Sequence, residues 1–87
     1  MRRDPEFFEG REPVLVYISK RLKEALKLES LLTGVGLDYG VEADHYTGGI
    51  IFRSERVGAF FYVLPEAADA TRRLLRANGY KTFDDLK

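Results

Sequence analysis

Between Gly58 and Gly79 the spacing of hydrophobic and polar positions changes in a way that predicts a strand followed by a helix. Residues 59–64, Ala-Phe-Phe-Tyr-Val-Leu, are aromatic and β-branched, which is typical of a buried strand. Pro65 suits the first helical position, because its φ is already helical and the N–H it lacks would be unpaired there. Gly79 is expected to end the helix in the left-handed conformation. Three- and four-residue spacing gives this helix one stripe, formed by Ala67, Ala70, Thr71, Leu74 and Asn78.

A similar strand–helix pair is predicted nearer the N-terminus. Val14 to Ile18 is rich in β-branched residues and is expected to be the first strand. Ser19 is a suitable N-cap for a helix that continues through Leu32 and ends in the region from Gly34 to Gly36. The expected apolar face of this helix consists of Leu22, Ala25, Leu28, Leu32 and Val35.

The segment between the two helices is expected to be a hairpin. Leu37 to Tyr46 is the second predicted strand, and Thr47-Gly48-Gly49 is the predicted turn onto Ile50 to Arg53. Ser54 to Gly58 is either a second turn or a bulge, so Ile50 to Gly58 forms one bent strand or two. In the second strand, Val41 and Ala43 are expected on one face, with Glu42 and Asp44 on the other.

This order of elements predicts an α+β fold of the ferredoxin-like type, a two-layer sandwich with the order βαββα. Right-handed crossovers would place both helices on one face of an antiparallel sheet. Tyr80 to Phe83 could add a short last strand. The expected core consists of Val16, Leu28, Leu32, Phe61, Val63 and Leu74.

Composition narrows the class of protein. The chain has 87 residues, of which 45% are apolar and 32% charged, as in a folded domain. We expect an irregular leader at residues 1–13, a single domain at residues 14–83 and a C-terminal tail at residues 84–87.

Fourteen basic and fourteen acidic side chains cancel, so no overall field attracts nucleic acid or a membrane. There is no secretory h-region and no apolar run near the roughly 20 residues that span a bilayer, so a cytoplasmic location is expected.

Two segments resemble a known family. Leu28 to Leu37, Leu-Glu-Ser-Leu-Leu-Thr-Gly-Val-Gly-Leu, is similar to the LKSLLEAAGI segment of the DUF2007 group, small bacterial domains of unknown function that are named for signal transduction. Tyr62 to Leu75 is similar to a strand–helix segment of that family, VPEEDAEEARELL, and Thr47-Gly48-Gly49 stands where its glycine loop would be. The resemblance covers Pro13 to Gly79 and is weakest at Ile50 to Gly58. It implies a regulatory role and supplies no catalytic residues.

Candidate chemistry is confined to the predicted hairpin. His45 is the only histidine and there is no cysteine, so no transition-metal site is expected. Its strand neighbours Asp44 and Tyr46 are expected on the opposite face and cannot act with it directly. Gly48 and Gly49 could present backbone N–H groups to an anion, with Arg53 or Arg56 nearby, although a plain hairpin turn is the preferred explanation. We therefore expect no catalytic residue, metal or cofactor. The alternative is an enzyme subunit that uses His45 and the Gly48-Gly49 loop.

The first and last strands indicate a binding surface. If their small residues lie beneath the helices, then Leu15, Tyr17, Phe60 and Tyr62 line the uncovered face. A free face of an antiparallel sheet should alternate with polar residues, and these strands do not, so we expect this face to be covered.

A second subunit and the leader are the two candidates for this cover. The leader could contribute Phe7 and Phe8. We favour a small binding or regulatory module that acts as a homodimer or binds a protein partner or small ligand. RNA binding through the aromatic face is the other alternative, and the zero net charge counts against it.

Overall fold

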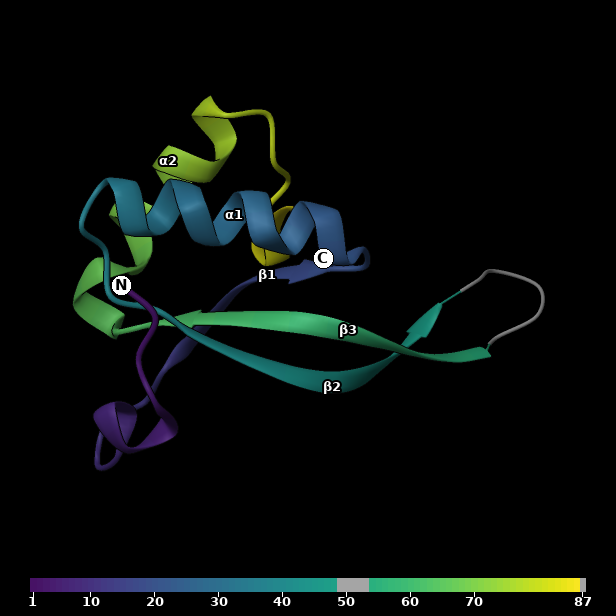
Figure 1. Cartoon of the computed structure of the whole chain (residues 1–87), viewed down its shortest axis with the longest axis horizontal. Coiled ribbons are helices and arrows are strands. Elements are labelled where there is room, and N and C mark those ends of the chain that lie inside the picture. Colours follow the sequence, from purple (N-terminus) through teal and green to yellow (C-terminus); the bar gives the residue numbers. More distant parts are fainter. Residues whose placement is uncertain (49–53, 87) are drawn as a thin grey trace.

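The computed structural model describes residues 1–48 and 54–86. Within these residues the strands and α-helices are β1 (Val14–Ser19), α1 (Leu22–Gly34), β2 (Gly40–Gly48), β3 (Ser54–Val63) and α2 (Ala68–Ala77) (Figure 1). Short 3-10 helices occur at η1 (Pro5–Phe8), η2 (Pro65–Ala67) and η3 (Phe83–Leu86). In the described part of the chain, no helix is both long enough and apolar enough to cross a membrane.

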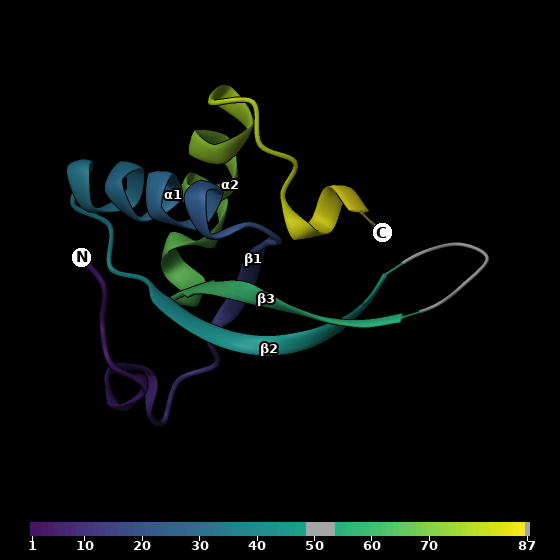
Figure 2. The ribbon, with the colours of Figure 1, turned by 45° about the vertical axis from the view of Figure 1, so that its right-hand side comes forward.

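The three strands form one antiparallel sheet in the order β1-β3-β2. β3 is central and antiparallel to both neighbours, so β1 and β2 run parallel to each other at the two edges. Figures 1 and 2 show α1 and α2 on the same side of this sheet. The predicted α+β class, with both helices on one face of an antiparallel sheet, is confirmed.

The core lies between the helices and the sheet. Five of the six predicted core residues are completely buried, namely Val16, Leu28, Leu32, Phe61 and Val63. The sixth, Leu74, is only half-buried, and its neighbour Leu75 is buried in its place. Successive α-helical residues lie about 100° apart, so α2 cannot point both leucines at the sheet, and it turns Leu75 inward. The buried stripe of α2 is therefore Ala68, Thr71 and Leu75.

The ends of the two helices agree only in part with the predicted caps and apolar face. Gly36 and Gly79 follow α1 and α2 with φ angles of +77° and +84°, as expected for left-handed helix ends. At the start of α1, Ser19 does not cap the helix, because the N-cap residue is Arg21. The Ser19 hydroxyl has two acceptors in reach, Arg21 O and Glu24 Oε1, and donates to one of them at a time. The buried apolar face of α1 is also shorter than predicted. Its two end residues, the first residue Leu22 and the C-cap Val35, are 76% and 52% exposed.

A bulge in β1 changes which side chains face the helices. Tyr17 pairs with Phe61 and Ile18 with Phe60, and the register shifts between Leu15 and Tyr17, where Val16 is the additional residue. Tyr17 therefore lies on the helix side, where its hydroxyl donates to Glu24 Oε1 at 3.0 Å. Burial and then this hydrogen bond raise the pKa of the Tyr17 hydroxyl. The prediction that Tyr17 lies on the uncovered face is wrong, and Ile18 takes its place there.

The hairpin is longer than predicted. β2 continues to Gly48, which pairs with Ser54, so Thr47 and Gly48 are strand residues and not part of the turn. Residues 54–58 belong to the same continuous strand as residues 59–63, which excludes a second turn there. Gly49 and the predicted strand at residues 50–53 lie outside the described residues.

The expected short strand at Tyr80 to Phe83 does not form. These residues lead into η3, whose start is held by Asp85 Oδ2, 3.1 Å from the backbone N of Thr82. Arg76 of α2 pairs with Asp85 at 3.0 Å. The C-terminal acidic residues thus tie η3 to α2, and this local capping replaces strand pairing.

Candidate functional site

The sheet face opposite the helices, called the outer face below, brings together three of the four predicted surface residues. Leu15 pairs with Tyr62 and Ile18 with Phe60, so these side chains share the outer face. Phe60 is only 8% exposed, although it lies outside the core cluster beneath the helices. The apolar part of the outer face is therefore already largely buried in a single chain.

The N-terminal leader covers one end of the outer face. η1 lies on the side of the sheet away from the helices (Figure 2). Phe8 is 7% exposed, and a Cβ built on Gly40 would lie 2.8 Å from its ring atom Cε2. The Phe8 ring therefore packs directly on the backbone of Gly40, which pairs with Tyr62. The leader, one of the two candidate covers, occupies this end of the face.

The leader also pairs with the chain just before β2. Arg2 and Tyr39 form a parallel bridge, in which Arg3 N donates to Tyr39 O at 2.7 Å and Tyr39 N donates to Met1 O at 3.1 Å. The backbone N–H and C=O groups of Tyr39 therefore point away from β3. Backbone groups of successive strand residues point in alternate directions, and β2 keeps an unbroken register with β3. The backbone groups of Val41 and Ala43 consequently point to the same free side as those of Tyr39.

Beyond Tyr39 this side of β2 is open. In the described part of the chain, no hydrogen bond outside the sheet ladder reaches the backbone of Val41 or Ala43. The open segment ends at His45, whose backbone N–H donates to the Asp44 carboxylate at 2.7 Å. We call Val41 to Ala43 the open edge.

A hollow of about 290 Å³ lies on the helix side of the open edge, between α1 and the β2–β3 hairpin. Val41 and Ala43 line it from β2, and Leu22 and Val57 line it from α1 and β3. Leu22 is 76% exposed and Val57 is 58% exposed. This hollow is called the apolar hollow below, and the basic residues Arg2, Lys20 and Arg21 also line it.

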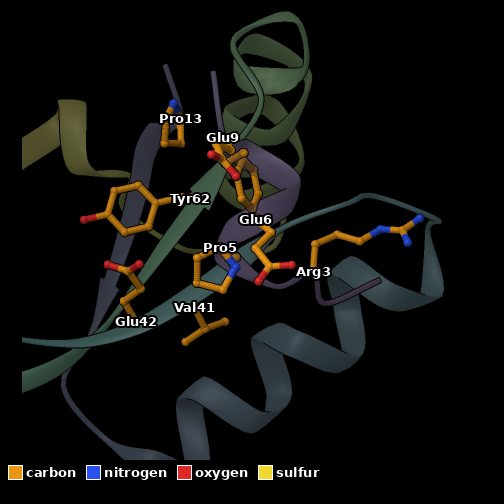
Figure 3. A pocket seen from close by; sticks show the side chains of 10 residues that line it. Arg3, Pro5, Glu6, Glu9, Pro13, Val41, Glu42 and Tyr62 are labelled. Carbon is orange, nitrogen blue, oxygen red and sulfur yellow. The ribbon is translucent and has the colours of Figure 1, made fainter. Parts of the chain in front are cut away.

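A larger pocket, of about 540 Å³, lies on the outer face between η1 and the sheet (Figure 3). We call it the outer pocket. Its apolar walls include Pro5, Phe8 and Pro13, and its acidic lining residues are Glu6, Glu9 and Glu42.

Tyr62 also lines the outer pocket. Burial, followed by the negative charges of Glu42 and Asp44, raises the pKa of its hydroxyl. The outer face thus carries negative potential where the pocket opens.

The structure describes only part of the predicted ligand loop, so this loop stays a prediction. His45 pairs with Val57 and Arg56 with Tyr46, so strand alternation places His45 and Arg56 on opposite faces of the hairpin. Gly48 is part of β2, and Gly49 and Arg53 lie outside the described residues. Among the described residues, no three histidine, aspartate or glutamate side chains are grouped as a metal site requires.

His45→Ala is expected to leave the free energy of unfolding within about 0.5 kcal/mol of wild type, because His45 is an exposed side chain on a strand. Chemical denaturation of both proteins measures this difference. Zinc titration by calorimetry provides a second readout, with heats expected at the level of buffer dilution. Tight zinc binding that His45→Ala abolishes would contradict the expectation that the chain holds no metal site.

The open edge and the outer pocket were missed by the sequence analysis, because both depend on where the leader docks. The sequence carried one local indication: Val41 and Ala43 alternate with Glu42 and Asp44, which is typical of a strand with one solvent-exposed face. No family model, curated protein or solved structure matches this chain.

Proposed function

We propose that this domain is a protein-interaction module that binds an extended segment of a partner protein as an additional strand at the open edge of β2. In strand addition, backbone hydrogen bonds supply affinity, and pockets for alternate side chains supply specificity. The observation that carries the proposal is the open edge itself. The chain's own leader already pairs at Tyr39, and the same side of Val41 and Ala43 has no partner in the described structure.

The surroundings of the open edge support a protein partner. Leu22, Leu26 and Val57 are each more than half exposed, and two of them line the apolar hollow beside the edge. Exposed edge strands are commonly guarded by charges, prolines or bulges. Here Glu42 and Asp44 place two charges on β2, and Asp44 also accepts from the His45 backbone N–H. The backbone groups of Val41 and Ala43 that point away from β3 nevertheless have no hydrogen-bond partner in the described part of the chain. An incoming strand would bury this apolar surface and pair the open backbone groups.

A second copy of the chain fits the open edge poorly. Antiparallel self-pairing that uses both Val41 and Ala43 must place its twofold axis at Glu42, so that two Glu42 carboxylates face each other. Like charges directly opposite in a sheet are destabilising. The homodimer expected from the sequence would form through the outer face. Phe8 and Phe60 are already buried there within one chain, so little of that surface is left for a second subunit. A different protein is therefore the favoured partner.

We also propose that the fold is ferredoxin-like and that the domain has the regulatory role implied by the DUF2007 resemblance. The order β1-β3-β2, with α1 connecting two parallel edge strands, agrees with a split βαβ unit. Glu42 and Asp44 of β2 lie on the outer face, which is the face that an RNA would have to bind. Their negative charges repel phosphates, which favours a protein partner over a nucleic acid.

Ala43→Pro tests the proposal, because proline removes an edge N–H while sparing the bonds between β2 and β3. The probes are ten-residue synthetic peptides in which valine alternates with lysine, threonine or glutamate. At least one is expected to shift the amide NMR signals of residues 41–43 in wild type. Ala43→Pro should weaken this binding about tenfold, the effect of losing roughly one backbone hydrogen bond.

Ala43→Thr is the matched control, since it keeps the N–H and should bind like wild type. A peptide with N-methylated valines, which should not bind, provides a test that leaves the protein unchanged. If no peptide shifts the edge amides, or if Ala43→Pro and Ala43→Thr bind equally well, the proposed function is wrong.

A further inference from the structure

We infer that the outer pocket receives a lysine or arginine side chain of the bound segment, so that the partner presents alternating apolar and basic residues. This inference rests on the proposed strand addition, and it adds the chemistry of the partner. It follows from three observations: the position of the pocket relative to the open edge, the mixed lining of the pocket, and the unbalanced charge of that lining.

The position of the pocket determines which partner side chains reach it. Side chains of an added strand alternate between the two faces in step with Val41, Glu42 and Ala43. Those level with Val41 and Ala43 face the apolar hollow, whereas the side chain level with Glu42 faces the outer side. Glu42 itself lines the outer pocket, so the residue beside it is directed toward that pocket.

The lining of the pocket suits a long side chain with a charged end. Pro5, Phe8 and Pro13 provide apolar walls for a methylene stem. Lysine and arginine commonly bury their stems along apolar surface while the charged group reaches polar partners. The carboxylates of Glu6, Glu9 and Glu42 are available for that group.

The charge of the lining is unbalanced. In the described part of the chain, Glu6, Glu9 and Glu42 take part in none of the ion pairs. The one basic residue of the lining, Arg3, is already paired with Asp38 at 2.8 Å. Figure 3 shows the Arg3 side chain extending away from Tyr62 and Glu42. Three carboxylates therefore remain without a counter-charge, and a cation from the partner would provide it.

The experiment compares the lysine, threonine and glutamate peptides by calorimetry at low salt. Wild type is expected to bind the lysine peptide about tenfold more tightly than the glutamate peptide, with the threonine peptide between them. The preference should decrease as salt is added. Only the lysine peptide should shift the ring protons of Phe8 and Tyr62, because only its side chain enters the pocket.

Two charge variants make the test specific. Glu42→Lys leaves Glu6 and Glu9 beside one added cation, so it is expected to bring the affinities of the lysine and glutamate peptides close to equality. Glu66→Lys makes the same change in net charge on η2, outside the lining of the pocket, and should preserve the order. If the peptides bind the open edge of wild type with equal affinity, or if both variants change the preference alike, the inference is wrong while strand addition stands. If no peptide reaches the edge, both fail.

Discussion

Leu75→Ala is expected to lower the free energy of unfolding by about 2–5 kcal/mol, while Leu74→Ala should cost clearly less. Leu75 is completely buried in the same cluster as Phe61 and Val63, whereas Leu74 only packs against that cluster. Truncating Leu75 therefore removes buried methyl groups and leaves a cavity beneath α2. Truncating Leu74 removes a side chain that is already partly in water.

Urea denaturation of the two variants and wild type provides the measurement. The paired leucines are adjacent on one helix and lose the same atoms, so helix propensity and composition are matched. Small domains have a total stability of only about 5–15 kcal/mol, so Leu75→Ala should also lower the melting temperature markedly. Equal losses, or a larger loss for Leu74→Ala, would mean that the helix presents the other stripe to the sheet.

Phe8→Ala is the second substitution with a large expected effect, a loss of about 3–5 kcal/mol. The ring is 7% exposed and packs on Gly40. Phe7→Ala is the matched control and should cost less, because Phe7 is only half-buried and packs edge-on to Phe8. Chemical denaturation compares the two variants.

Light scattering decides whether the leader or a second subunit covers the outer face. If the leader is the cover, the wild-type protein has the mass of one chain, and removing residues 1–12 lowers its stability. If the wild type is a dimer that Tyr62→Glu converts into a folded monomer, the outer face is a subunit interface. In that case Phe8 would not be its main cover.

The elements with regular spacing were predictable from the sequence. The buried strand before Pro65, the left-handed glycines after both helices and the two faces of β2 follow from local preferences, and the structure has them. Five of six core residues were also predictable, because periodicity alone places them on inward faces.

The misplaced residues follow irregularities that periodicity does not reveal. One additional residue at Val16 moves Tyr17 to the helix side, and the rotation of α2 about its own axis, which tertiary packing sets, turns Leu75 inward in place of Leu74. Both the outer pocket and the open edge depend on contacts between the leader and residues that are distant in the sequence, such as Arg2 with Tyr39. Local sequence patterns carry no information about such contacts.

The bulge in β1 also bears on how the sequence can vary over evolutionary time. Strand alternation directs neighbouring apolar side chains to both faces, and the bulge adds Val16 on the helix side, so every residue from Val14 to Ile18 is at least half-buried. A charged replacement at any of these positions would have to be buried, so few mutations in β1 can be selectively neutral. The exposed residues 42–44 of β2 are under no such constraint. Drift at the edge strand could therefore change the partner that the domain recognises while its core stays fixed.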